Sequence, residues 1–190
     1  MQTNHWVLIA CVVVFTALAA ILDLRTKKLP NLLTVTAFAT AILFHLCVGA
    51  VTGGWAGAGQ RLLFSLGGFG TGFGILLVLW LIGSGGGGDV KYMGALGAWL
   101  GAVLTLQVFV VSAFLILIGA CGVLVWEFFR LGFRRSREKY VESGSLQGGR
   151  NISEERRKTR RRLLPFGIPA ALATWVVLCL DAIRNGAGVP

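Results

Sequence analysis

The sequence predicts an all-α integral membrane protein with six transmembrane helices. Of its 190 residues, 55% are hydrophobic and only 14% are charged, and the mean hydropathy is +0.75. These values lie outside the range of ordinary soluble domains. Most of the polar residues fall in one segment, 130–162, which leaves no second region able to form a soluble core. Residues 1–190 are therefore predicted to form one polytopic membrane domain.

The first apolar run, residues 6–22, is predicted to be a membrane helix whose N-terminus lies outside. A secretory signal peptide carries basic residues before its apolar core, whereas here the cations at 25–28 follow it. Five further runs have lengths mostly near the ~20 residues that cross a bilayer core. They are 32–52, 62–83, 90–105, 107–129 and 163–183. The fourth and fifth runs lack a strong turn signal between them, and we place their boundary near Thr105 to Gln107.

The distribution of cations predicts the orientation. With the N-terminus outside, 16 Lys and Arg residues lie on the inner side and only Arg61 and Arg184 lie on the outer side. The positive-inside rule favours this arrangement. It places both chain ends outside and makes 130–162 a basic cytosolic loop between the fifth and sixth helices. We expect this loop to contact anionic lipid headgroups, with docking of a partner as the alternative.

Composition also excludes two classes of ligand. The net charge of +10 comes from clusters that flank apolar runs, so the lipid bilayer rather than nucleic acid is the predicted partner. The four cysteines are isolated within apolar runs and are interpreted as small packing residues: Cys11, Cys47, Cys121 and Cys179. A zinc site requires clustered ligands, so no metal and no cofactor are predicted.

Small and polar residues within the spans are interpreted first as packing features. Gly70 with Gly74, and Gly97 with Gly101, have the small-xxx-small spacing of closely packed membrane helices. A glycine-lined substrate path is the alternative. His45 is the only ionisable residue well inside the second span, and we expect it to pack or to hydrogen-bond to a neighbouring helix.

Carboxylates in apolar surroundings are expensive and therefore point to function. Four of the eight acids lie in the predicted loop. Glu127 and Asp181 each precede an arginine by three positions at a helix end, where a local ion pair would account for them. Asp23 and Asp89 remain, at the end of the first span and the start of the fourth. The predicted topology places both at the inner membrane face.

Two neighbouring carboxylates cannot both ionise easily, so they share a proton and can hold a water molecule between them. One carboxylate removes a proton from the water while the other protonates the carbonyl under attack, as in aspartic proteases. We therefore predict that Asp23 and Asp89 form a catalytic dyad that needs no metal.

The residues around each acid are predicted to support it. Gly86 and Gly88 leave space beside Asp89 and expose backbone with which an extended peptide can pair. Anion binding at this helix start is an alternative, although neither GK[ST] nor GxGxxG occurs here. Lys91 is expected to extend toward the inner interface, with substrate orientation or tuning of the dyad as the alternative. Pro30 can start the second helix, and with Asn31 it forms a short, stiff loop that would hold Asp23 at a defined depth.

Three segments resemble the type IV prepilin peptidases. GGGGDVKYMGALGAWLG, residues 85–101, resembles the GxGD signature of that family. DLRTKKLPN, residues 23–31, looks like its first-aspartate motif, and LPFGIPAAL, residues 164–172, is similar to the segment that opens its last helix. The resemblance implies that Asp23 and Asp89 are catalytic. It also implies cleavage of the short basic leader of prepilin-like proteins at the cytosolic face of the bacterial inner membrane, with pilus assembly proteins as further partners.

The resemblance is to the short members of the family, which serve tight-adherence (Flp-type) pili. Larger members carry a cytosolic domain with paired CxxC motifs that methylates the new N-terminus. Here only 22 residues precede Asp23 and no CxxC occurs, so we expect no methyltransferase activity.

Two other classes of function remain open. Proton- or ion-coupled transporters also use intramembrane acids, but usually near the bilayer midplane in the broken helices of repeated halves. Here both acids are predicted at one face. A noncatalytic assembly subunit of a pilus or secretion system would require both acids to be dispensable.

Overall fold

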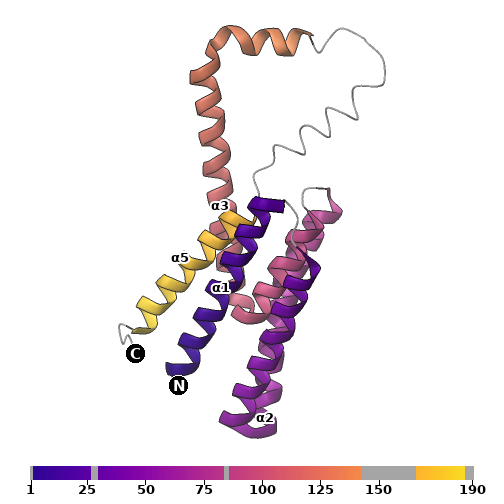
Figure 1. Cartoon of the computed structure of the whole chain (residues 1–190), viewed down its shortest axis with the longest axis vertical. Helices are drawn as coiled ribbons and strands as arrows, with labels where there is room; N and C mark the ends of the chain where they lie inside the picture. The colour runs from indigo at the N-terminus through magenta and orange to yellow at the C-terminus, as the bar shows by residue number, and fades with distance from the viewer. Residues whose placement is uncertain (1, 27–29, 84–85, 143–165, 187–190) are drawn as a thin grey trace. The chain divides into compact units, whose positions relative to one another are not determined.

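The computed structural model describes residues 2–26, 30–83, 86–142 and 166–186, and these residues are helical apart from short connections. The helices are α1 (Gln2–Thr26), α2 (Asn31–Leu81), α3 (Gly87–Glu142) and α5 (Gly167–Gly186) (Figure 1). Four segments in the described ranges are long and apolar enough to span a membrane: His5–Thr26, Asn31–Leu81, Gly87–Trp126 and Gly167–Arg184. The prediction of an all-α membrane protein is confirmed to this extent.

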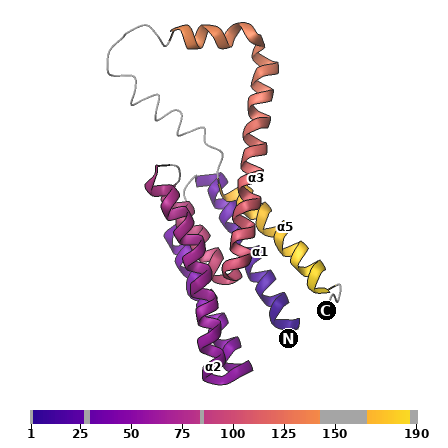
Figure 2. The same cartoon turned by 180° about the vertical axis from the view of Figure 1, so that it is seen from behind.

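Helix α2 is two limbs joined by a break. Its 51 residues would extend about 76 Å if straight, more than twice the thickness of a bilayer core. Gly53 and Gly54 depart from helical geometry, and Gly54 has a φ of 59°, in the left-handed region that glycine tolerates. The aromatic rings of Phe38 and Phe69 lie 4.7 Å apart, so the limbs pack against each other (Figures 1 and 2). The second limb includes residues 55–61, which precede the start predicted at residue 62.

Helix α3 also turns back on itself. A side chain on Gly72 would contact both the Met93 carbonyl and, at 3.1 Å, the Cγ2 atom of Thr105. A straight helix would separate these two residues by about 18 Å. The chain therefore reverses near Gly101, whose φ is 76°. The predicted boundary near Thr105 to Gln107 is wrong, because the left-handed residue occurs four positions earlier.

The chain divides into two compact units, and the second, Phe114–Leu164, contains the rest of α3. This helix continues to Glu142, beyond the end predicted at residue 129. Residues 130–142 were assigned to the basic loop because the segment 130–162 is polar, carries mixed charges and contains several glycines, although Arg, Lys and Glu favour helix formation. The remainder of that predicted loop, 143–162, lies outside the described residues, and so do the side chains of Glu127 and Arg130.

In the first unit, α1 and α5 lie side by side and antiparallel (Figures 1 and 2). Trp175 Nε1 on α5 donates a hydrogen bond of 3.0 Å to Thr16 Oγ1 on α1. The first limb of α3 supplies much of the core, with Tyr92, Met93 and Leu96 fully buried. This places the segment that follows Asp89 among the least exposed parts of the unit.

A seam of small residues joins α2 to α3, but only half of it matches the prediction. Gly97 contacts the backbone of Gly68, and a Cβ on Gly68 would contact the backbone of Gly97 and Gly101. In contrast, a Cβ on Gly70 or Gly74 would meet no atom within 4 Å. Two residues correspond to about 200° around a helix, so the predicted glycines of α2 lie on the wrong face.

His45 has the predicted interhelical contact. Its side chain is fully buried, and Nε2 donates a hydrogen bond of 3.2 Å to the carbonyl oxygen of Trp99. The interpretation of the four cysteines as packing residues is wrong, because all four are exposed on the helix surfaces. The predicted ion pair between Asp181 and Arg184 is also absent, although the structure describes both side chains.

Candidate active site

Asp23 lies near the end of α1, one turn before its last residue. Its side chain is only 8% exposed. Carboxylate Oδ2 accepts a hydrogen bond of 2.9 Å from the backbone N–H of Gly167, the first residue of α5. The first N–H groups of a helix have no partner within the helix and carry partial positive charge. The contact therefore satisfies one of them and fixes the orientation of the carboxylate.

Gly167 is a site residue that the sequence analysis did not select, although it lies within the segment 164–172. A Cβ atom at this position would lie 2.7 Å from Asp23 Oδ2 and 3.1 Å from Asp23 Cβ. Only a residue without a side chain fits against the aspartate. The resemblance of segment 164–172 indicated the start of the last helix but not what its first N–H would meet.

Asp89 lies in the first turn of α3 and is half-buried. Its backbone N–H donates a hydrogen bond of 3.0 Å to the carbonyl oxygen of Gly86. A Cβ on Gly86 would lie 3.0 Å from Asp89 Oδ2, so this glycine leaves the carboxylate its space. Gly88 also lies in the first turn of the helix.

The two aspartates, 66 positions apart in the sequence, interact electrostatically in the structure. The charge of Asp23 acts electrostatically on the carboxyl group of Asp89. The end of α1 and the start of α5 thus meet at Asp23, whose charge reaches Asp89 at the start of α3. Two carboxyl groups in this arrangement can share a proton and polarise a water molecule.

Three other predicted residues form a neighbouring contact. Pro30 is the N-cap of α2, as predicted for a residue that starts this helix. Asn31 follows it, and Lys91 Nζ donates a hydrogen bond of 3.0 Å to Asn31 Oδ1. Lys91 thus binds the start of α2 rather than only extending to the interface.

We expect the bond between Lys91 and Asn31 to stabilise the fold only slightly, because it is exposed to solvent. Asn31→Ala should lower the melting temperature by no more than about 3 °C. Lys91→Ala should have no further effect in that background. A double-mutant cycle, in which the melting temperatures of the wild type, the two single variants and the double variant are compared, measures the coupling between the two side chains. Strictly additive effects would show that the two side chains do not interact in the membrane.

Tyr92 is a further residue near the acids that the sequence analysis missed. It is fully buried, and its ring stacks on that of Phe15 at a centroid distance of 5.4 Å. The charge of Asp23 also acts on its hydroxyl group. Its burial depends on the packing of α1 against α3, which no local motif encodes.

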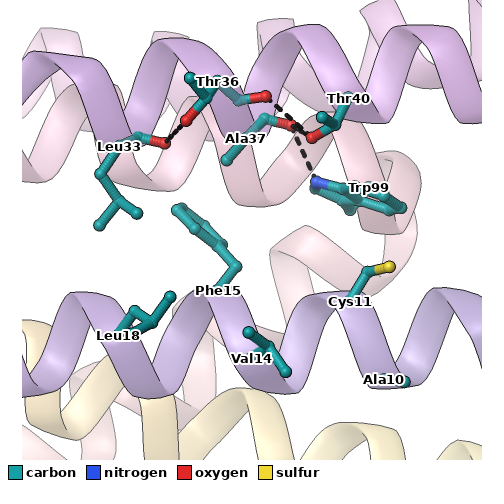
Figure 3. Close-up of a pocket in the computed structure, with 10 residues that line it drawn as sticks. All are labelled: Ala10, Cys11, Val14, Phe15, Leu18, Leu33, Thr36, Ala37, Thr40 and Trp99. Carbon is teal, nitrogen blue, oxygen red and sulfur yellow. Dashed lines mark hydrogen bonds between the residues drawn. The ribbon is translucent and has the colours of Figure 1, made fainter.

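An apolar cavity of about 420 Å³ lies between α1 and α2 (Figure 3). Its walls are Ala10, Cys11, Val14, Phe15, Leu18, Leu33, Thr36, Ala37, Thr40 and Trp99. The hydroxyl groups of Thr36 and Thr40 donate to carbonyls of their own helix, and Trp99 Nε1 donates to the Ala37 carbonyl at 2.9 Å. These polar groups are already paired, so the cavity suits an apolar occupant. Leu18 lies five residues before Asp23, about 7 Å along the helix axis.

The sequence of the chain was compared with models of known protein families. Residues 9–121 match the model of the type IV leader peptidase family, which covers more than half of the chain. The chain belongs to the type IV leader peptidase family. Comparisons with curated proteins and with solved structures found no match.

Membership of the type IV leader peptidase family makes the chain a peptidase, hence a hydrolase, with prepilin-like substrates in a membrane environment. The matched region contains most of α1, all of α2 and the part of α3 up to Cys121, and therefore both aspartates. Helix α5, which supplies the N–H group to Asp23, follows the matched region.

Proposed function

We propose that the chain is an aspartyl endopeptidase that removes the short basic leader from Flp-type prepilins. The observation that carries this proposal is the electrostatic interaction of two acids at helix ends, Asp23, held by the Gly167 N–H, and Asp89. Two acids at helix ends also favour a peptidase over an ion-coupled transporter, whose acids lie near the midplane. The deciding test is whether cleavage of a coexpressed prepilin depends on both carboxylates.

The two acids have different surroundings, which supports different roles. Asp23 is the more buried, and its carboxylate is held by the Gly167 N–H. It is suited to hold the hydrolytic water and accept its proton. Asp89 lies beside Gly86 and a backbone without side chains, where a peptide can approach. It is suited to protonate the scissile carbonyl, and neither a metal nor a covalent intermediate is needed.

We propose six membrane crossings: α1, the two limbs of α2, the two limbs of α3, and α5. In this topology both termini lie outside, and the acids face the cytosol of a bacterial inner membrane. The count of cations supports this orientation. We expect hydrolysis without methyltransferase activity, and pilus assembly proteins are the expected further partners.

The cavity between α1 and α2 supports a place for the substrate. Prepilin-like substrates of the kind the resemblance implies carry a hydrophobic helix directly after the cleaved bond. The cavity is apolar, begins about 7 Å along α1 from Asp23 and faces the bilayer with exposed residues such as Val14. We propose that it receives the first turns of that helix.

Filling the cavity should weaken substrate binding. Thr40→Trp places an indole among the cavity walls and should raise KM roughly tenfold with little change in kcat, a loss of one binding contact. Ala39→Trp is the matched control, because Ala39 is also exposed on α2 but does not line the cavity. Cleavage kinetics with a purified prepilin measure both. Equal changes in KM for the two variants would remove the cavity from the binding path.

A further inference from the structure

The hydroxyl group of Tyr92 is a buried polar group that needs an explanation. The residue is 0% exposed, and among the described residues Oη has no hydrogen-bond partner. An unpaired buried hydroxyl destabilises a protein, and phenylalanine would pack the same space without that cost. The position therefore gains something from the hydroxyl that packing does not supply.

The position of Tyr92 in the structure indicates what the hydroxyl group contributes. Tyr92 follows Asp89 by three positions on α3, so the two side chains share one face of the helix. Its ring stacks on Phe15 of α1, the helix that also carries Asp23. The charge of Asp23 acts on the Tyr92 hydroxyl, although the two groups make no direct hydrogen bond in the structure. The hydroxyl therefore lies within the electrostatic influence of Asp23, on a residue one turn after Asp89, and bonds directly to neither acid.

We propose that Tyr92 is a positioning residue of the dyad, whose hydroxyl holds the Asp23 carboxylate in place through one bridging water. Polar groups too far apart for direct contact are often joined in this way. A phenol donor and a carboxylate provide the polar partners that a buried water requires. Asp23 would then be held from two sides, by the Gly167 N–H of α5 and by Tyr92 of α3. This inference rests on the proposed function, in which Asp23 is catalytic.

The first test measures stability and does not depend on peptidase activity. Tyr92→Phe should lower the melting temperature by about 3 °C, the effect of losing one buried hydrogen bond in a chain of this size. In an Asp23→Ala background the same substitution should have no such effect, because the acceptor is gone. Thr105→Val is the matched control, since Thr105 has a buried hydroxyl on α3 that donates to the Gly101 carbonyl. It should lower the melting temperature equally in both backgrounds.

The second test measures cleavage. Tyr92→Phe should lower kcat about tenfold with KM unchanged, because a misplaced carboxylate raises the barrier without affecting binding. Thr105→Val should leave kcat unchanged. If the wild-type chain cleaves no prepilin, the proposed function fails, and the stability cycle still decides the role of Tyr92. The inference would be overturned if Tyr92→Phe left the melting temperature unchanged or raised it, or lowered it equally in the wild-type and Asp23→Ala backgrounds. A Tyr92→Phe variant with the wild-type kcat would also overturn it.

Discussion

Asp23→Asn or Asp89→Asn should abolish leader cleavage while the protein still folds and inserts. An amide has nearly the shape of a carboxyl group but cannot accept or transfer the proton. General acid–base catalysis contributes about 10²–10⁴-fold, so each variant should lose roughly 10³-fold in kcat/KM. In the Asp23→Asn variant the new amide oxygen can still accept the Gly167 N–H, which should preserve the packing of α1 on α5. Coexpression with a tagged prepilin, followed by the mobility shift of the processed form, measures the loss.

Asp181→Asn is the control for these substitutions. Asp181 lies 14 residues after Gly167 on α5, about 21 Å away along the helix. The same change in charge should therefore leave cleavage at the wild-type rate. The double variant Asp23→Asn with Asp89→Asn should be no slower than either single variant, because residues that act as a unit are not additive. Processing of the leader by both single variants would contradict the dyad.

The sequence selects the two aspartates as candidates because strong, simple physical effects apply to them. An acid in an apolar segment is costly, and cations orient membrane helices. Together these effects singled out Asp23 and Asp89 and placed them at one face before any contact was considered. In the structure the charge of Asp23 acts on Asp89, and the shared membrane face stays a prediction. The resemblance of the flanking motifs led to the same family that the comparison identified.

The breaks in the long helices were harder to predict, because a glycine is compatible both with a break in a helix and with close packing between helices. Gly53 and Gly54 lie together in a less apolar stretch, and the second predicted span, 32–52, ends directly before them. Gly101 lies within an apolar segment that reads as continuous helix, and its spacing from Gly97 suggested only packing. In the structure Gly101 breaks the helix, with a left-handed φ, and it also packs against Gly68. Hydropathy does not distinguish these cases.

Features that depend on tertiary contact left no local signal. The sequence GGFGTGFG offers two stripes of small residues on α2, at 68 and 72 and at 70 and 74. Only packing against α3 decides which stripe is buried. The roles of Gly167 and Tyr92 likewise arise where α5 and α3 meet the end of α1, at residues more than 60 positions from Asp23. A sequence pattern identifies the acids but not what holds them.

Gly167→Ala should reduce cleavage about 10²-fold, although alanine is a better helix former than glycine. The added methyl group would lie 2.7 Å from Asp23 Oδ2 and 3.1 Å from Asp23 Cβ. Asp23 Cβ is fixed to the backbone and cannot move aside, so the carboxylate must rotate and lose the Gly167 N–H. A displacement of about 1 Å at a catalytic group is enough for a loss of this size. Single-turnover cleavage with saturating prepilin measures the effect on the chemical step.

Gly70→Ala is the matched control, because its methyl group would meet no atom within 4 Å. It should keep wild-type cleavage and gain about 0.5–1 kcal/mol of stability from the lower entropy of the unfolded chain. Gly167→Ala, by contrast, should gain no stability, since the clash with Asp23 offsets the helix propensity. A Gly167→Ala chain that is more stable and fully active would show that α5 does not hold Asp23 during catalysis. The contact between these helices would then be a feature of the resting protein alone.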